Sequence, residues 1–409
     1  MSDRTNQTTP PTSEAPPKRG RRALAIGITS ALVAVAAANG VWQAVSASTP
    51  EPGPGEVIEQ QLDGLVELGF PGALASWTEA DGDHGDYVAG VGDTSTGALP
   101  PVDGEVRVAS NTKTYTAVVV LQLVEEGLVA LDEPIETYLP GLVRGEGIDG
   151  AAITVRQLLQ HTSGLPTYTD GIALEIEELQ HAYAPPRDLL DLALSQPATS
   201  APGEKWEYSN TNYVLLGMLV ERLTERPLYE QVTDRIIEPL GLEHTYFPVP
   251  GEQELRGAHP QGYHVDSRGE QLDVTELDPS FGWAAGAVVA SPSELNEFFR
   301  AIFDGRLLGD EMLAEMTTTV PSDDGLWEGS GYGLGIHSFP LGDGRVVWGH
   351  GGDIHGSLTR NGVTEDGEAF TVAVTSLPWA FLDPADEEEL MAGYRAVTDA
   401  VEAAFAAAG

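Results

Sequence analysis

Segments with the residue pattern of β-strands stand at the two ends of the chain. Residues 72–80 and 85–93 are rich in small apolar, β-branched and aromatic residues, and a turn-forming Asp-Gly-Asp-His stretch joins them. Residues 106–110 predict a third, shorter strand. Towards the C-terminus the strand character returns in four stretches with tight links, at 331–339, 344–352, 355–362 and 368–376.

Between these two groups, apolar residues recur at helical spacing. From residue 111 to about 127 one such series is formed by Val118, Leu121, Val124 and Leu128. Residues 130–280 mix further helical segments with long Pro- and Gly-rich loops. A helix is predicted at 291–305 with Ser293 as its cap, and a closing helix at 386–408.

Strands at both ends and helices between them predict an α/β (α+β) fold. We expect one antiparallel sheet built from both chain ends, flanked by helices, with a mostly helical lobe inserted between the two groups of strands. A cleft between the sheet and the lobe is the natural place for a binding site.

The N-terminal residues differ from the rest in composition. Residues 1–20 are rich in Thr, Pro and Ser, a basic stretch at 18–22 follows, and residues 23–38 are apolar and small, with a cleavage site expected after Ala47. This pattern resembles a secretory signal peptide. We therefore predict a leader at 1–47, a linker at 48–56 and one domain at 57–409 that is secreted. The alternative is a membrane anchor, because residues 23–45 can span a bilayer core of about 30 Å.

Composition excludes several classes of function. The 409-residue chain carries a formal net charge of −42, from 63 acidic and 21 basic residues. Neutralising nucleic-acid phosphates needs clustered Lys and Arg, so no nucleic acid is expected as a partner. With no cysteine, the chain has no thiol nucleophile, disulfide or thiolate metal site. His259 and His264 lack the carboxylate–histidine helix motif of zinc enzymes, so neither a metal nor a cofactor is predicted.

Only three lysines occur in the chain, and Lys113 stands three residues after Ser110, at the start of a predicted helix. Positions i and i+3 share a helix face, so the hydroxyl and the amine can meet over the first turn. A serine hydroxyl becomes a strong nucleophile when a base takes its proton, and a lysine can be that base if burial lowers its pKa. Taken alone, the Ser-x-x-Lys spacing more often marks a helix cap beside a solvated lysine.

Two further stretches carry groups that suit the same chemistry. Tyr208 and Asn210 stand one residue apart, and a buried tyrosine can relay protons while an asparagine amide can bind a substrate amide. His350 precedes Gly351 and Gly352 just past a predicted strand, where glycines allow a substrate to approach the backbone closely. His350 can donate a hydrogen bond or supply positive charge, or it can be a structural turn residue.

The order of these motifs resembles the penicillin-recognising serine hydrolases. This family comprises class C β-lactamases, Streptomyces-type serine D-alanyl-D-alanine carboxypeptidases, and related esterases and D-amino-acid peptidases. Its three motifs match SNTK at 110–113, YSN at 208–210 and HGG at 350–352. The flanks ITVRQLLQHTSGL, PGEKWEYSNTNYVLLGMLVERLT and GYGLG also resemble the carboxypeptidase-like branch. The resemblance runs from about Val57 to the C-terminal helix.

The resemblance implies a role for each matched residue. Ser110 would be the acylated nucleophile and Lys113 its neighbour in the proton network. Tyr208 would act as the base in acylation and pass a proton to the leaving group. Asn210 would hold the substrate amide, and His350 would replace the lysine that many members have in the third motif.

Further positions follow from the same resemblance. The backbone N–H groups of Ser110 and Asp353 would form the oxyanion hole. The substrate-binding residues would be Gly351, Gly352, Asp353 and His337, with Phe281 and Trp283 lining the groove or belonging to the core.

The chain departs from the carboxypeptidase pattern at the end that grips the substrate carboxylate. His337 stands where an arginine is expected, Gly351 replaces a Thr or Ser, and Asp353 replaces a threonine. A carboxylate facing a substrate carboxylate is unfavourable. Asp353 would instead suit a substrate with a free ammonium, or point into solvent. The alternative is that Arg360, a few residues further on, compensates for the missing arginine by holding the substrate carboxylate.

The sequence thus predicts a secreted serine hydrolase that forms an acyl-enzyme, with a D-alanyl-D-alanine carboxypeptidase as the first hypothesis. An esterase or D-amino-acid amidase is the next, and a β-lactamase follows. The non-enzyme alternatives are a penicillin-binding sensor or an inert homologue. The expected partner is a small peptide, ester or β-lactam substrate, and no protein partner is predicted.

Overall fold

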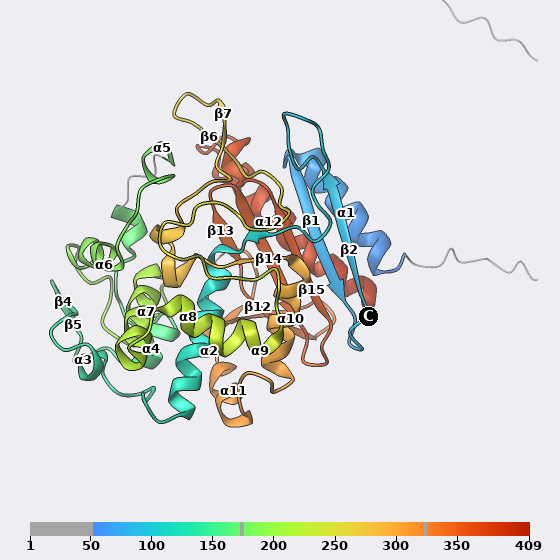
Figure 1. Cartoon of the computed structure of the whole chain (residues 1–409). Coiled ribbons are helices and arrows are strands. Elements are labelled where there is room, and N and C mark those ends of the chain that lie inside the picture. The colour runs from blue at the N-terminus through green and yellow to red at the C-terminus, as the bar shows by residue number, and fades with distance from the viewer. Residues whose placement is uncertain (1–51, 172–175, 323–324) are drawn as a thin grey trace, which may run out of the picture. The chain divides into compact units, whose positions relative to one another are not determined.

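Both ends of the described chain meet in one antiparallel sheet of nine strands. The computed structural model describes residues 52–171, 176–322 and 325–409. The strands run in the order β2-β1-β15-β14-β12-β11-β10-β9, and β13 pairs with β14. Figure 1 shows the blue N-terminal strands beside the red C-terminal ones. The strands are β1 Gly72–Thr78, β2 His84–Gly90, β9 Val320–Pro321, β10 Gly331–Tyr332, β11 His337–Pro340, β12 Val346–Gly349, β13 Gly352–Ile354, β14 Ser357–Val363 and β15 Ala369–Val374.

Helices cover both faces of the sheet, so its central strands are buried on both sides. Phe370 and Val372 of β15 pack with helices α1 (Pro54–Leu68) and α12 (Glu387–Ala408). Ala373, which alternates with them, belongs to the cluster that contains α10 (Pro292–Phe303). Since successive side chains of a strand point to opposite faces, the two clusters are the two layers of core on either side of the sheet.

The residues between β2 and β9 form the largely helical lobe (Figure 1). Helix α2 (Thr112–Glu125) lies at its centre and is buried on nearly every side, including its polar first turns. The other helices are α3 Ile135–Tyr138, α4 Val155–Leu159, α5 Ile176–Leu179, α6 Pro186–Leu194, α7 Asn210–Thr224, α8 Leu228–Val232, α9 Glu238–Leu240 and α11 Asp310–Met316. Three two-stranded antiparallel sheets complete it. Two are hairpins, β4 Arg144–Gly145 with β5 Ile148–Asp149 and β6 Tyr263–Val265 with β7 Gln271–Asp273, and the third pairs the distant strands β3 Val106–Arg107 and β8 Val289–Ala290.

The architecture confirms the predicted α/β class, with a sheet from both chain ends and an inserted helical lobe. Three details differ from the predictions. Helix α1 begins at Pro54, inside the predicted linker 48–56. The third strand is only Val106–Arg107 and pairs with β8 outside the main sheet. The cap of α10 is Ser291, whose hydroxyl accepts from the Glu294 N–H, whereas Ser293 donates its hydroxyl to Asp103.

The predicted leader 1–47 lies outside the described residues. Among the helices of the described ranges, none is both long and apolar enough to cross a membrane. In the same part of the chain, no group of three or more His, Cys, Asp or Glu side chains is placed so that it could hold a metal ion.

Candidate active site

Ser110 lies in a single 3₁₀ turn, Ala109–Asn111, which leads directly into α2. Ala109 has φ = 48°, in the left-handed region that residues with a Cβ seldom adopt. The Asn111 side chain secures this turn by donating to the Val108 carbonyl (2.9 Å) and to the Thr359 hydroxyl (2.9 Å). Ser110 is therefore held at the first turn of a rigid, buried helix, at the junction of the lobe and the sheet.

Lys113 is fully buried one turn later and faces two oxygen atoms. Its Nζ lies 2.9 Å from the Ser110 Oγ and 2.8 Å from the Ala285 carbonyl oxygen. Burial lowers the pKa of Lys113 well below its usual value, and the charge of Asp353 opposes this only in part. A neutral amine can donate one hydrogen to the Ala285 carbonyl and accept the Ser110 O–H with its lone pair. The neutral Lys113 amine is thus close enough to the Ser110 hydroxyl to accept its proton.

Tyr208 completes the group around Ser110. Both side chains line the same pocket, and burial raises the pKa of the Tyr208 phenol well above its usual value, although the Ser110 hydroxyl acts in the opposite direction. The Lys113 Nζ lies 4.9 Å from the centre of the Tyr208 ring. A phenol with a raised pKa keeps its proton, so these pKa directions favour Lys113 as the group that takes the serine proton. Tyr208, expected from the resemblance to be the base, is then a neutral phenol.

His161 supports the Tyr208 ring from behind. The ring centres are 4.3 Å apart, and the His161 Nδ1 accepts from the Ser209 N–H at 3.2 Å. Burial lowers the pKa of His161 well below its usual value, so the ring is neutral at pH 7. This position agrees with a structural role for the HTSGL stretch.

His350 is held by both ring nitrogens. Its Nδ1 lies 2.6 Å from the Gly351 carbonyl oxygen, so Nδ1 carries the proton, and Nε2 accepts from the Tyr332 hydroxyl at 3.1 Å. Burial lowers the pKa of His350 well below its usual value, and the fields of His337 and Lys113 act in the same direction. At pH 7 His350 therefore supplies no positive charge, and the charge of the lysine found in other third motifs is not reproduced.

Gly352 allows strand β13 to approach the nucleophile turn closely. A Cβ at this position would lie 2.2 Å from the Val108 carbonyl oxygen and 2.5 Å from the Thr359 hydroxyl. No side chain fits there, and the glycine brings the backbone of Asp353 towards Ser110. This is the arrangement that an oxyanion hole formed by the N–H groups of Ser110 and Asp353 requires.

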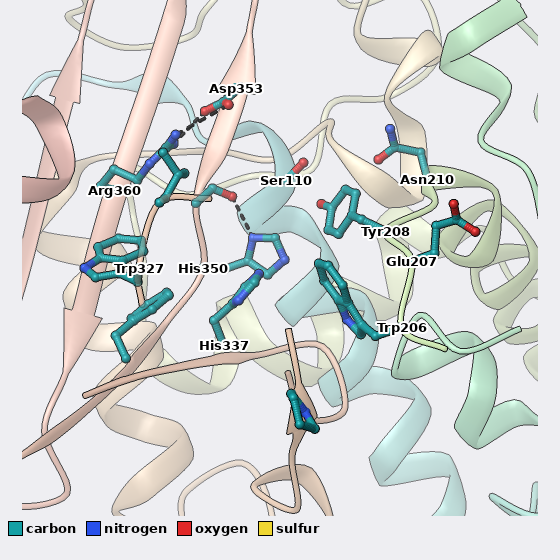
Figure 2. A pocket seen from close by; sticks show the side chains of 14 residues that line it. Ser110, Trp206, Glu207, Tyr208, Asn210, Trp327, His337, His350, Asp353 and Arg360 are labelled. Atoms are coloured by element: carbon teal, nitrogen blue, oxygen red, sulfur yellow. Dashed lines mark hydrogen bonds and ion pairs between the residues drawn. The ribbon is translucent and has the colours of Figure 1, made fainter. Parts of the chain in front are cut away.

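Asp353 and Arg360 form an ion pair at the wall of the same pocket (Figure 2). The Arg360 Nη1 lies 2.5 Å from Oδ1 of Asp353 and also donates to the Thr359 carbonyl at 2.8 Å. The guanidinium side chain is only 2% exposed, whereas the Asp353 side chain is 44% exposed. The arginine is thus buried behind the carboxylate, and the carboxylate faces the pocket.

The pocket has a volume of about 740 Å³ and opens over Ser110. In Figure 2, Ser110 and Tyr208 lie between the Asp353–Arg360 pair on one side and Asn210 and Glu207 on the other. The apolar part of the wall was not identified from the sequence. It is formed by Trp206, Pro321, Leu326, Trp327 and Phe339.

Only part of this apolar wall could have been predicted from the sequence. Trp206 stands two residues before Tyr208, inside a stretch that resembles the family. Trp327 lies in an irregular loop, and only its packing against Phe339, with ring centres 3.9 Å apart, shows that it belongs to the wall. His337, Gly351 and Asn210 line the pocket as expected.

Phe281 and Trp283, for which both the groove and the core were open, pack against core clusters and lie outside the described lining of the Ser110 pocket. Trp283 lines a separate cavity with Tyr183, Tyr229 and Phe247. Phe281 is absent from the described lining of the Ser110 pocket, and its carbonyl accepts from the Tyr168 hydroxyl at 2.5 Å. Both residues belong to short 3₁₀ turns, Pro279–Phe281 and Trp283–Ala285. The second turn carries the Ala285 carbonyl that holds Lys113, so its contribution to the site comes through the backbone.

Comparison with known proteins agrees with this fold. The family model described as Beta-lactamase matches residues 56–392, so the chain belongs to this family of serine hydrolases. A D-stereospecific amidohydrolase from Streptomyces sp. is 39% identical with a TM-score of 0.73, covering 78% of this chain and 94% of that one. The D-amino acid amidase from Ochrobactrum anthropi SV3, solved with L-phenylalanine, is 27% identical with a TM-score of 0.74, covering 87% of this chain and 98% of that one.

Curated relatives match over a smaller share of their length. The putative penicillin-binding protein PbpX of Bacillus subtilis is 28% identical over 57% of this chain and 53% of its own length. Protein flp of Staphylococcus aureus is 32% identical over 34% of this chain and 28% of its own. The match thus spans about half or less of these two relatives.

Proposed function

We propose that this chain is a serine amidohydrolase that acts on amides of D-amino acids with an unblocked amino group. The observation that carries the proposal is the Asp353–Arg360 pair. Arg360 is the only arginine or lysine among the described residues that line the pocket, and its guanidinium is already bound to a carboxylate of the chain itself. A carboxypeptidase needs a cation to hold the terminal carboxylate of its substrate, and the described lining offers no arginine or lysine without such a partner.

Acylation uses the groups around Ser110. The serine hydroxyl gives its proton to the Lys113 amine while its oxygen attacks the amide carbon. The N–H groups of Ser110 and Asp353 stabilise the developing oxyanion. The proton then passes by way of the Tyr208 hydroxyl to the departing nitrogen, which leaves as ammonia. Water attacks the acyl-enzyme in the second half of the reaction and releases the amino acid.

The charges of the pocket favour a cationic acyl group. Among the described lining residues, Glu207 and Asp353 are acidic against the single Arg360. With Lys113 neutral, the described lining carries one negative charge in excess. Lys205, outside that lining, pairs with Glu207 at 3.1 Å, so the net charge of −42 supplies the remaining attraction for a cation. A substrate with a free ammonium is attracted, whereas one with a free carboxylate is repelled.

The apolar wall accounts for the side chain of the substrate. Trp206, Trp327 and Phe339 offer aromatic surface of a size that suits a phenyl or long aliphatic group. The solved amidase from Ochrobactrum anthropi was crystallised with phenylalanine and phenylalanine amide. The preference for the D-configuration rests on the two amidohydrolase relatives, whose names state it.

We also propose that the domain acts outside the cytoplasm, on the basis of the leader-like composition of residues 1–47. N-terminal sequencing of the protein recovered from its producing cells and from their medium tests this. A start at or near Ser48 in the medium is expected for a cleaved leader. A cell-bound chain that retains residues 23–45 would indicate an anchor instead.

Ammonia release from D-phenylalanine amide tests the activity. L-phenylalanine amide, N-acetyl-D-phenylalanine amide and a diacylated Lys-D-Ala-D-Ala tripeptide serve as comparisons, and Ser110→Ala as the control. Serine-dependent turnover that is fastest with the free D-amide supports the proposal. Serine-dependent release of D-alanine from the tripeptide, without turnover of the D-amide, would establish the carboxypeptidase instead. Turnover of simple esters alone would indicate an esterase, and slow turnover of a stable penicilloyl adduct a sensor.

A further inference from the structure

Arg360 is an unusual residue for the wall of a pocket. It extends from β14 and is 1% exposed, yet a guanidinium keeps its positive charge at any ordinary pH. Burying such a charge without a partner costs several kcal/mol. Its partners are the Asp353 carboxylate, at 2.5 Å and 3.5 Å from Nη1 and Nη2, and the Thr359 carbonyl. The Asp353 carboxylate therefore compensates a cation that would otherwise stand buried behind the pocket.

The space for this guanidinium is provided by Gly351. A Cβ on Gly351 would lie 3.1 Å from Nη1 and 3.3 Å from Cζ of Arg360. A larger side chain at this position would have to share that space with the arginine. Gly351, Asp353 and Arg360 thus form one unit, in which a glycine makes room for a buried cation and a carboxylate neutralises it.

We propose that Arg360 is a carboxylate receptor that the chain fills with its own Asp353, so that the pair determines specificity against substrates whose leaving group ends in a carboxylate. A guanidinium presents a planar fork of N–H donors that matches a carboxylate in two hydrogen bonds. Asp353 occupies that fork from the pocket side and leaves its outer face exposed. A substrate carboxylate at this end meets a filled receptor and a second negative charge.

The inference deepens the proposed function, but its test does not depend on hydrolysis of D-amides. The probes are two thioesters of the same N-acylglycine. In one the leaving group is thioglycolate, which ends in a carboxylate, and in the other it is thioglycolamide, which is neutral. The ratio of their kcat/KM values isolates the effect of that carboxylate. For the full-length chain we expect the ratio to favour the neutral thioester.

Asp353→Asn should raise the ratio of carboxylate to carboxamide turnover by about tenfold or more, as expected for removing one like-charge contact and freeing the guanidinium. Adding Arg360→Gln to Asp353→Asn should abolish the gain. The matched control is Asp343→Asn, since Asp343 is 45% exposed and also pairs with an arginine, Arg345, at 2.8 Å, away from the described pocket lining. This control removes the same charge, and its ratio should equal that of the wild type.

Stability supplies a readout that needs no substrate. Acetate should raise the unfolding temperature of Asp353→Asn more than that of the wild type, because it fills the vacated receptor. It should give no such selective increase in the double variant. An unchanged thioester ratio in Asp353→Asn, a gain that persists without Arg360, or the absence of selective stabilisation by acetate would each overturn the receptor.

The two proposals can fail separately. If D-phenylalanine amide is not hydrolysed while the thioester ratio and the acetate effect behave as expected, the proposed substrate is wrong and the receptor stands. If the D-amide is hydrolysed while Asp353→Asn changes neither quantity, the amidase stands and the receptor is wrong.

Discussion

Replacing Lys113 with methionine tests the claim that its amine is neutral in the folded protein. Methionine fills nearly the same volume in this fully buried position and cannot be charged. The variant loses two polar contacts, and the Ala285 carbonyl that accepted from Nζ is left without this donor. That loss is expected to cost about 1–3 kcal/mol, and its size does not depend on pH.

The pH dependence of the free energy of unfolding shows whether the Lys113 amine is neutral in the folded protein. Burial lowers the pKa of Lys113 in the folded state, whereas the unfolded chain keeps a value near the ordinary 10.5. Between these two pKa values the unfolded wild type binds one more proton than the folded wild type at this site. The free energy of unfolding of the wild type, relative to the variant, should therefore rise with pH by about 1.4 kcal/mol per pH unit across that window. Above pH 10.5 the difference should become constant.

Urea unfolding followed by tryptophan fluorescence at intervals from pH 6.5 to 11 measures this difference. The pH at which the slope begins gives the pKa of Lys113 in the folded protein. Lys205→Met is the matched control, because it removes a lysine amine from a side chain that is 49% exposed. Parallel curves for the wild type and Lys113→Met over the whole range would refute the reasoning. They would mean that the buried amine keeps its proton and cannot accept one from the serine.

Three further outcomes follow from the same geometry. Tyr208→Phe should lower kcat/KM for an activated ester by about 10²–10⁴-fold, because the proton relay is lost. The urea midpoint of the variant should be unchanged, and turnover equal to that of the wild type would exclude the relay. Gly351→Ala should destabilise the fold by about 1–3 kcal/mol in urea titrations, since its Cβ presses on Arg360, and a neutral result would show that the guanidinium can move aside. The Asp353 charge raises the pKa of Lys113, and Arg360 offsets that charge. Arg360→Gln should therefore move the acidic limb of the kcat/KM–pH profile to higher pH, and Asp353→Asn should move it to lower pH. Shifts in the reverse directions would contradict Lys113 as the base.

The parts of the fold that local patterns encode were predictable from the sequence. Helix α2 was expected at 111–127 and spans Thr112–Glu125, because its apolar series has no competing interpretation. The pairing of both chain ends in one sheet followed from the distribution of strand-like segments. Helix α1 was missed because the Pro-Gly residues that open it were attributed to a linker, although proline is favoured in the first helical turn.

The candidate site was predictable only where its residues belong to sequence motifs. The grouping of Ser110, Lys113 and Tyr208 in one site could be expected from spacing and resemblance. The wall that includes Trp327 is assembled from loops, and no local pattern indicates which aromatic residue faces the pocket. The protonation states were also beyond sequence reasoning, because they depend on burial. His350 was expected to supply a hydrogen bond or positive charge, and its depressed pKa leaves only the neutral ring.

Lys113 can be neutral in a strongly acidic chain because burial affects its amine directly, whereas most of the acidic residues are far from it. Most of the 63 acidic residues can act on Lys113 only through solvent, where the interaction between unit charges is about 1 kcal/mol even at 4 Å and is further screened by salt. Burial acts on the amine directly and outweighs them. Asp353 is the carboxylate whose field reaches Lys113, and Arg360 neutralises it at 2.5 Å. The buried arginine thus has two effects: it pairs with the carboxylate whose charge acts on Lys113, and it thereby allows the amine beside Ser110 to remain a base.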